Sequence, residues 1–196
     1  MNYPNGMGGR GRNTQSNKKN NISFSNRGMS LEADINATNE YYLTHDLAVI
    51  HKKPTPVQIV KVNYPKRSAA VITEGYFKQA STTDYNGIYQ KRHIDFEAKE
   101  TNHKTRFPLA NIHEHQINHM ENVVRHGGIC FLLIRFKPYQ ETYFVKADEL
   151  ISYWYDALKG GRKSVPYDTI KNIGYLTPFH YLKRVDYLRI IDRLYF

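Results

Sequence analysis

The 196-residue sequence contains only one cysteine and no long hydrophobic run. Cys130 cannot form a disulfide within the chain, so a reducing compartment suits the protein. It lies in the apolar run Ile129–Ile134, which is far shorter than the roughly 20 residues needed to cross a bilayer. The N-terminus has no apolar stretch typical of a signal peptide. We therefore expect a cytoplasmic protein with no membrane segment.

Acidic residues are also scarce. The chain has 18 Asp and Glu against 28 Lys and Arg, a formal net charge of +10. Such an excess suggests a polyanionic partner, with nucleic acid first and an anionic membrane surface second. The ordinary alternative is a soluble protein that happens to be basic. The length suits one domain with a proper core.

The first 28 residues contain no acid at all and are rich in Gly, Asn and Ser. Such a segment buries too little apolar surface to offset the entropy lost on ordering. We predict a flexible basic arm over residues 1–28 and a folded domain over residues 29–196. Arg27 is a candidate DNA contact. A merely solubilising tail explains residues 1–20 equally well.

Hydrophobic periodicity and turn residues predict mixed secondary structure beyond the arm. The expected helices cover residues 31–43, 111–125, 148–158 and 186–195. The expected strands cover residues 47–50, 57–64, 69–77, 81–89, 92–101, 129–136 and 142–147. This order implies a mixed sheet with helices on its faces, an α/β or α+β domain.

Residues 52–78 carry six basic residues against a single acid, and two β-rich runs flank a Pro-containing turn. We predict a protruding basic ribbon or stalk over about residues 54–80. Lys52 and Arg67 would neutralise phosphates, and Tyr76 and Phe77 would stack on accessible bases. Core packing is an equal alternative for the two aromatic residues.

Residues 92–101 alternate apolar and polar side chains, as a strand does when its two faces differ. Asp95, Glu97 and Lys99 point to one face, while the apolar side chains between them point to the other and join the core. A solvated outer face is the ordinary explanation for such alternation.

Asp84, on the neighbouring strand 81–89, favours a different explanation. If the two strands pair, the carboxylates of Asp84 and Glu97 converge. Carboxylates about 4 Å apart repel by roughly 4 kcal/mol at an effective dielectric constant of about 20, and a divalent cation removes this repulsion. Oxygen ligands with retained waters suit Mg²⁺, and Lys99 can reach a metal-bound water or the reacting phosphate. Asp84 with Glu97-Ala98-Lys99 resembles the D…(D/E)-x-K motif of the restriction-endonuclease-like nuclease superfamily.

Gln116 falls on the apolar stripe of the helix 111–125, where a polar amide needs a partner. It either caps a strand carbonyl or lies at the edge of the metal site. Glu32 is a weaker candidate, since acids commonly occupy the first turn of a surface helix. The histidines of the helix 111–125 do not form an H-E-x-x-H zinc motif, because Ile117 occupies its last position.

The chain resembles the RecU-type Holliday junction resolvases of low-GC Gram-positive bacteria from about Asn26 to its C-terminus, more loosely toward the end. Five strings carry the resemblance: Asn26–Met29, His51–Val60, Tyr64–Ser68, Ser81–Tyr85 and Ile94–Thr101.

The resemblance implies a restriction-endonuclease-like core, in which a central mixed sheet is flanked by helices and a basic stalk protrudes. It also implies a homodimer. Thr82, Asp84, Glu97 and Gln116 match the family's Mg²⁺-binding positions. Lys99 matches the residue that stabilises the transition state.

The implied activity is Mg²⁺-dependent resolution of Holliday junctions by paired nicks, in homologous recombination, DNA repair and chromosome segregation. Such proteins are linked with the strand-exchange recombinase and the branch-migration motor. Two rival hypotheses are a non-catalytic protein that binds branched DNA and a duplex endonuclease of the same superfamily. An RNA-binding protein is less supported, because the sequence has no RRM-like aromatic signature.

Overall fold

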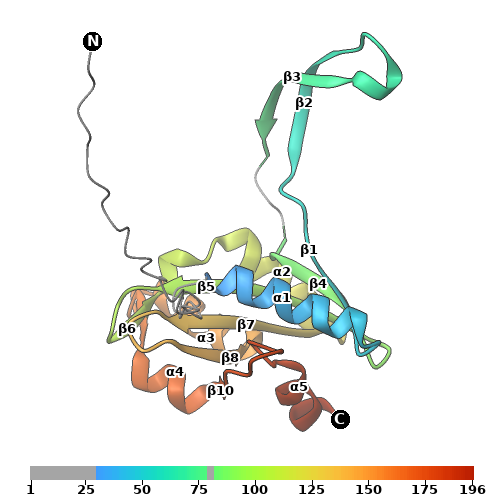
Figure 1. The fold of residues 1–196 in the computed structure, drawn as a ribbon. Helices are drawn as coiled ribbons and strands as arrows, with labels where there is room; N and C mark the ends of the chain where they lie inside the picture. Colours follow the sequence, from blue (N-terminus) through green and yellow to red (C-terminus); the bar gives the residue numbers. More distant parts are fainter. Residues whose placement is uncertain (1–29, 79–81) are drawn as a thin grey trace, which may run out of the picture.

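A six-stranded mixed sheet forms the centre of the computed structural model, which describes residues 30–78 and 82–196 (Figure 1). The strand order is β1-β4-β5-β7-β8-β10, and β5 and β7 are parallel while the other neighbours are antiparallel. The strands are β1 Val49–Lys52, β4 Tyr85–Tyr89, β5 Arg92–Thr101, β7 Ile129–Phe136, β8 Glu141–Lys146 and β10 Tyr175–Thr177. A further antiparallel pair joins β6 Arg106–Pro108 to β9 Ser164–Pro166. The mixed α/β class predicted from the sequence is confirmed, and the arrangement is consistent with a restriction-endonuclease-like fold.

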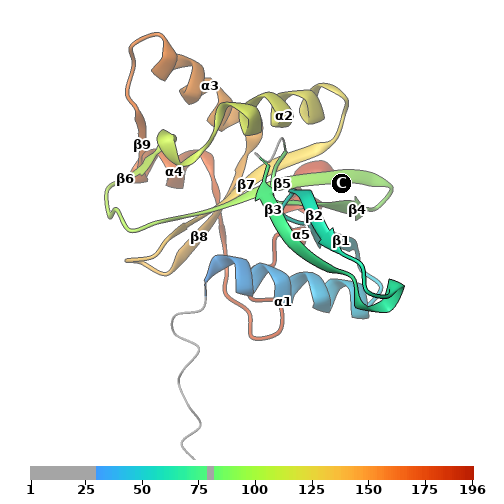
Figure 2. The ribbon, with the colours of Figure 1, turned by 90° about the horizontal axis from the view of Figure 1, so that it is seen from above.

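Helices cover both faces of this sheet (Figure 2). The helix α1 Leu31–Thr44 and the helix α5 Leu188–Tyr195 pack on one face. On the other face lie α2 Glu114–Arg125, α3 Ala147–Leu158 and α4 Tyr167–Ile173. Every residue of β7 is buried because both of its faces are covered. In the described part of the chain, no helix is long and apolar enough to cross a membrane.

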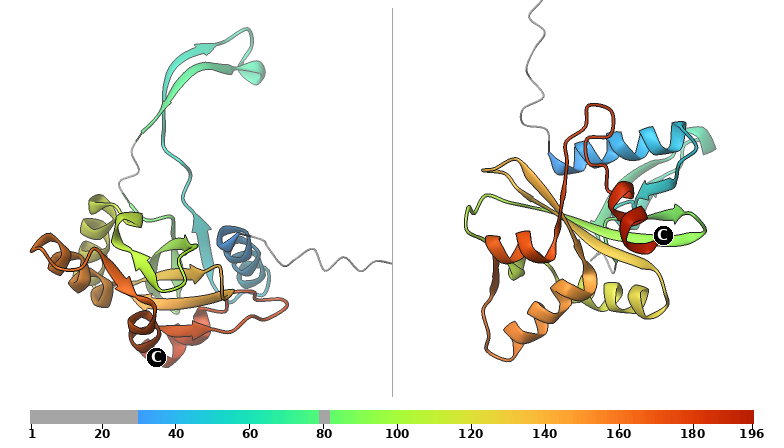
Figure 3. Two further views of the ribbon diagram at one scale, coloured as in Figure 1. Left: turned by 90° about the vertical axis from the view of Figure 1, so that its left-hand side faces the viewer. Right: turned by 90° about the horizontal axis from the view of Figure 1, so that it is seen from below.

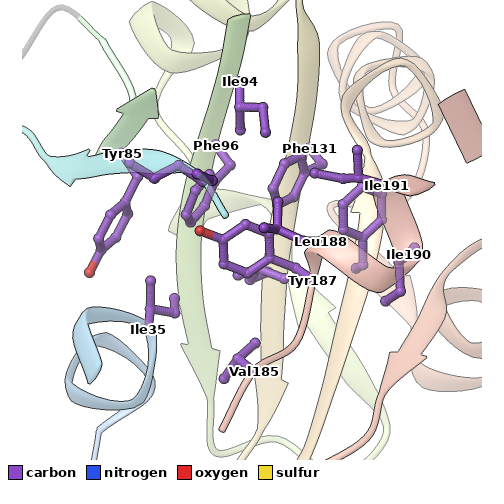
Figure 4. Close-up of a cluster of buried hydrophobic side chains, with 14 of the residues drawn as sticks. Ile35, Tyr85, Ile94, Phe96, Phe131, Val185, Tyr187, Leu188, Ile190 and Ile191 are labelled. Carbon is purple, nitrogen blue, oxygen red and sulfur yellow. The ribbon is translucent and has the colours of Figure 1, made fainter. Parts of the chain in front are cut away.

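Stacked aromatic rings dominate the core on the α1 side (Figure 4). Tyr85 on β4 stacks on Phe96 of β5 at 4.8 Å between ring centroids, and Phe96 stacks on Phe131 of β7 at 4.7 Å. Phe131 in turn stacks on Phe144 of β8 at 4.2 Å. Offset ring contacts of this kind stabilise a core beyond the area that they bury. The sheet around β5 is therefore a rigid support for side chains on its opposite face.

A tight turn at Gln90 and Lys91 joins β4 to β5. Both residues have positive φ angles, 46° and 64°, as the two central residues of a type I′ hairpin turn do. The pairing of these two neighbouring strands, on which the convergence of Asp84 with Glu97 depends, is thus confirmed. At Gly87 of β4, a Cβ atom would lie 2.1 Å from the carbonyl oxygen of Val49, so glycine is what lets β1 lie against β4 here.

Several predicted boundaries differ from the structure. The strand predicted over residues 47–50 is β1 Val49–Lys52, because the N–H groups of residues 47 and 48 close the end of α1 on the carbonyl of Tyr42. The helix predicted from residue 111 begins at Glu114, after a 3-10 turn at Leu109–Asn111. The strand predicted from residue 81 begins at Tyr85, and the last helix begins at Leu188.

The strands β2 Val57–Asn63 and β3 Val71–Phe77 form a separate two-stranded ribbon that projects from the body (Figures 1 and 3). A 3-10 helix, Arg67–Ala69, lies at its far end. Nearly every described residue of the ribbon is exposed. We call residues 54–78 the stalk, and its protrusion was correctly predicted.

Candidate active site

The pairing of β4 with β5 places Asp84 opposite Glu97. Tyr85 pairs with Phe96 at the end of the ladder, so the next positions are Asp84 and Glu97. The backbone N–H of Asp84 donates a hydrogen bond to Oε2 of Glu97 at 3.0 Å. On its other side, the backbone N–H of Lys53 donates to the carbonyl oxygen of Asp84 at 2.7 Å. Asp84 is therefore held between the edge strand and β5.

Glu97 is a fully buried carboxylate, with 0% of its side chain exposed. Burial raises its pKa to about 7; the positive charge of Lys99 opposes this rise and the charge of Asp84 adds to it. The Nζ atom of Lys99 lies 2.7 Å from Oε1 of Glu97. The structure thus brings Asp84, Glu97 and Lys99 together, as the strand alternation predicted.

The polar face of β5 is not a solvated surface. Asp95 is 1% exposed and Glu97 is 0% exposed, since α2 covers this face. The ordinary explanation of the alternation is therefore wrong. A buried carboxylate is stable only when it is paired or binds a metal, because the charged form loses its hydration.

A cavity of about 260 Å³ opens beside Asp84 and Lys99. Asp84, Lys99 and Glu100 line it together with the start of α1. Glu32 also lines this cavity and forms an ion pair with Lys52 at 2.5 Å. A reacting group in the cavity would have access to both Asp84 and Lys99.

The other two residues predicted to hold the metal have local partners. Gln116 is buried in the first turn of α2, and its Oε1 accepts a hydrogen bond from the backbone N–H of His113 at 3.1 Å. This oxygen thus caps the start of its own helix. Thr82 is half-buried two positions before Asp84, and its hydroxyl donates to the carbonyl of Thr83 at 3.3 Å. A metal-binding role for Gln116 and Thr82 stays a prediction.

The donor set suits Mg²⁺ better than a transition metal. Over residues 30–78 and 82–196, no three His, Cys, Asp or Glu side chains are grouped so that they could hold a metal ion. Mg²⁺ commonly binds one or two carboxylates and keeps several waters, so the adjacent carboxylates of Asp84 and Glu97 meet its requirement.

Asp95 was placed on the site's face by the sequence but received no role. The structure places four side chains around its carboxylate. They are Lys53 at 2.9 Å, His119 at 3.2 Å, His93 at 3.5 Å, and Thr83, whose hydroxyl donates to Oδ1. Strand alternation could have singled out Asp95. Nothing in the sequence pointed to Lys53 or Thr83 as its partners.

The predicted DNA contacts on and near the stalk are accessible where the structure describes them. Tyr76 is 60% exposed and Phe77 is 83% exposed, so the core-packing alternative is wrong for both. Lys52 is exposed at the foot of the stalk. Arg27 and the side chain of Arg67 lie outside the described residues.

Comparisons with known proteins agree on one family. Residues 26–193 match the family model RecU, described as recombination protein U. The chain is 66% identical over 196 residues to the Holliday junction resolvase RecU of Oceanobacillus iheyensis, with both chains covered in full. It is 56% identical over 196 residues to that of Geobacillus kaustophilus, covering 100% of this chain and 98% of the relative. It is 55% identical over 197 aligned residues to that of Bacillus subtilis, covering 99% of this chain and 95% of the relative.

Proposed function

This chain belongs to the RecU family, and on that premise we propose that it is an endonuclease that resolves Holliday junctions by paired nicks. The observation that carries the proposal is the buried Glu97, which lies beside Asp84 and Lys99 on a chain of formal charge +10. Relatives of more than half identity over the whole chain are named Holliday junction resolvases.

The residues of the site fit Mg²⁺ as the cofactor. Asp84 and Glu97 would hold it, with Thr82 and Gln116 assisting. When bound, Mg²⁺ polarises the scissile phosphate and lowers the pKa of a bound water. Because Glu97 is buried and close to Asp84, a cation here would relieve the repulsion between two carboxylates.

Lys99 supplies positive charge at the cavity that Asp84 also lines. Its ammonium group would stabilise the negative charge that develops on the phosphate oxygens during cleavage. Its ion pair with Glu97 holds the ammonium group in place before the substrate arrives. Charged groups fixed in advance lower the barrier, because they need not reorganise during the reaction.

The stalk would enter the centre of the four-way junction. Its lysines would contact phosphates, and Tyr76 and Phe77 would stack on bases at the open crossover. A homodimer would place one active site at each of the two strands to be cut, since the substrate itself has two-fold symmetry. In the cell we place this activity in the cytoplasm, in recombination, repair and chromosome segregation. There the protein would meet the strand-exchange recombinase and the branch-migration motor.

Cleavage of a labelled four-way junction tests the proposal. The full chain should nick the junction at paired positions when Mg²⁺ is present and not when the metal is chelated. Asp84→Ala should abolish cleavage, since it removes one of the two carboxylates. Asp156→Ala is a suitable control because this aspartate is exposed on α3, away from the site. An Asp84→Ala variant that cleaves as fast as the unaltered chain would show that the proposed site is wrong.

Two further outcomes separate the rival functions. Tight junction binding with no nicking at any Mg²⁺ concentration would identify a non-catalytic protein that binds branched DNA. Equal cleavage of junction and linear duplex in competition would identify a duplex endonuclease. Neither rival explains both the convergence of Asp84 with Glu97 and the exposed stalk.

A further inference from the structure

A second buried carboxylate lies beside the active site, on the same face of β5. We propose that Asp95 is a positioning residue, which fixes Asp84 opposite Glu97 by binding Lys53, just before the stalk, and Thr83, shortly after it. We call these two residues the feet of the stalk. This inference rests on the proposed nuclease function. Asp95 would not touch the substrate or the metal, and it would act through Thr83 and Lys53.

The contacts of Asp95 are directed at the two segments that enter and leave the stalk. Lys53 directly follows β1 and precedes the stalk, and its Nζ lies 2.9 Å from Oδ2 of Asp95. Thr83 directly precedes Asp84, and its hydroxyl donates to Oδ1 of Asp95. Lys53 also donates to the hydroxyl of Thr83 at 3.0 Å. Three side chains therefore close one polar cluster.

This cluster joins positions that the chain itself separates. Lys53 and Thr83 are 30 positions apart in the sequence, with the stalk between them. The carboxylate of Asp95 is attached to β5, two positions from Glu97, and β5 is anchored in the core. Asp95 thus ties both feet of the stalk to the strand that carries Glu97.

The backbone of Asp84 has the same neighbours. Lys53 donates its N–H to the carbonyl of Asp84 at 2.7 Å, and the N–H of Asp84 reaches Glu97 at 3.0 Å. Asp84 lies just beyond the last residue pair of the β4–β5 ladder. Its position therefore depends on these two bonds and on the Asp95 cluster at the adjacent residue.

Two histidines complete the surroundings of Asp95. His93 approaches it from β5 itself and His119 approaches from α2. His93 and Lys53 approach Oδ2 of Asp95, and His119 and Thr83 approach Oδ1. The bonds from Lys53 and Thr83, with the two imidazoles beside them, hold the carboxylate in one position, as a group that orients a neighbour must be.

Asp95→Asn is the variant that tests the proposal, because it keeps the size of the side chain and removes its charge. Loss of a residue that orients a site commonly costs about 10–100-fold in activity, and we expect such a fall in the single-turnover rate of junction cleavage. The junction Kd should stay within about two-fold, because Asp95 is buried and its side chain is not accessible to DNA.

Asp186→Asn is the matched control. Asp186 is also a buried aspartate that binds a lysine and a hydroxyl group, with Lys183 at 2.7 Å and Tyr42 at 2.8 Å, but it lies on the α1 side of the sheet. Asp186→Asn should lower the unfolding midpoint and leave the cleavage rate unchanged. If both variants lose rate only in proportion to lost stability, Asp95 has a structural role alone and the proposal fails.

Exchange of backbone amide hydrogens gives a readout that does not need activity. The N–H groups of Lys53 and Asp84 are both bonded in the structure, so they should exchange slowly. Asp95→Asn should speed their exchange by about tenfold or more while core strands stay protected. Unchanged protection of both amides would overturn the proposal even if the cleavage rate fell.

A double-mutant cycle tests whether Lys53 and Asp95 act as one unit. If they do, Lys53→Met with Asp95→Asn should be no slower than the slower single variant, since one contact is lost only once. Multiplied effects would show that the two residues act independently.

Thr83→Val, which removes only the hydroxyl group, is the test variant if Asp95→Asn does not fold. An unchanged cleavage rate in Thr83→Val would then reject the proposal. If the unaltered chain does not cleave at all, the proposed nuclease function is rejected. The exchange measurement would still test whether Asp95 holds Asp84 in place.

Discussion

The protein offsets much of the charge at the site with its own groups. Glu97 receives the N–H of Asp84 on one oxygen and the ammonium group of Lys99 on the other. Even so, burial together with the charge of Asp84 raises the pKa of Glu97 to about 7 against the opposing effect of Lys99. The site is therefore arranged in advance but still favours an additional cation.

Lys99 should matter for the rate of cleavage more than for binding. Removing one group that stabilises transition-state charge costs about 10²–10³-fold in rate, and we expect a fall of this size for Lys99→Met in single-turnover cleavage. The control is Lys137→Met, since Lys137 is half-exposed and lies 4.0 Å from Glu100. A Lys99→Met rate within about three-fold of the unaltered chain would contradict the assigned role.

At the scale of residues, site residues could be found from the sequence where they share one regular strand or lie on its hairpin partner. Glu97 and Lys99 were found because side chains alternate along β5, and Asp84 because the hairpin pairs neighbouring segments. Lys53 and Thr83 were not found, since their contacts with Asp95 join residues that the stalk separates. The partner of Gln116 was also missed, because capping of α2 depended on where that helix begins.

At the scale of elements, the stalk is separate in structure from the body. Its strands pair with each other and are exposed along nearly their whole length. The ribbon was predictable because two β-rich runs flank a short turn. The boundary of α2 was less predictable, since the 3-10 turn before it depends on packing of Leu109 and Ile112 in the core.

Replacing residues 57–77 with a short Gly-Ser linker should show that the stalk determines which DNA is bound but is not needed for the body to fold. The unfolding midpoint should change little, because the removed strands bury almost nothing against the body. Preference for a four-way junction over linear duplex, measured by competition, should fall by about tenfold or more because the phosphate and stacking contacts are lost. Intact preference in a folded variant would show that the stalk does not select the junction.

At the scale of the whole molecule, the formal charge of +10 should make DNA binding strongly salt-dependent. Each phosphate contact contributes a slope of about −0.9 in log K against log salt. A variant with Lys61→Gln and Lys66→Gln should therefore flatten the slope by about two if both stalk lysines contact phosphates. The measurement is junction affinity across a salt series. A slope that is unchanged in this variant would place the phosphate contacts elsewhere on the protein.

The exposed ribbon also affects how the free protein behaves in concentrated solution. Its strands carry apolar side chains at the surface, such as Ile59 and Ile72, and within the described part of the chain each strand has an outer edge that pairs with no other strand. Such edges invite strands from other copies, and charged lysines oppose that pairing. The charges that attract DNA thus also keep the copies apart. Salt high enough to release the DNA screens this repulsion as well, so the protein stays dispersed best at low ionic strength or when its stalk is occupied.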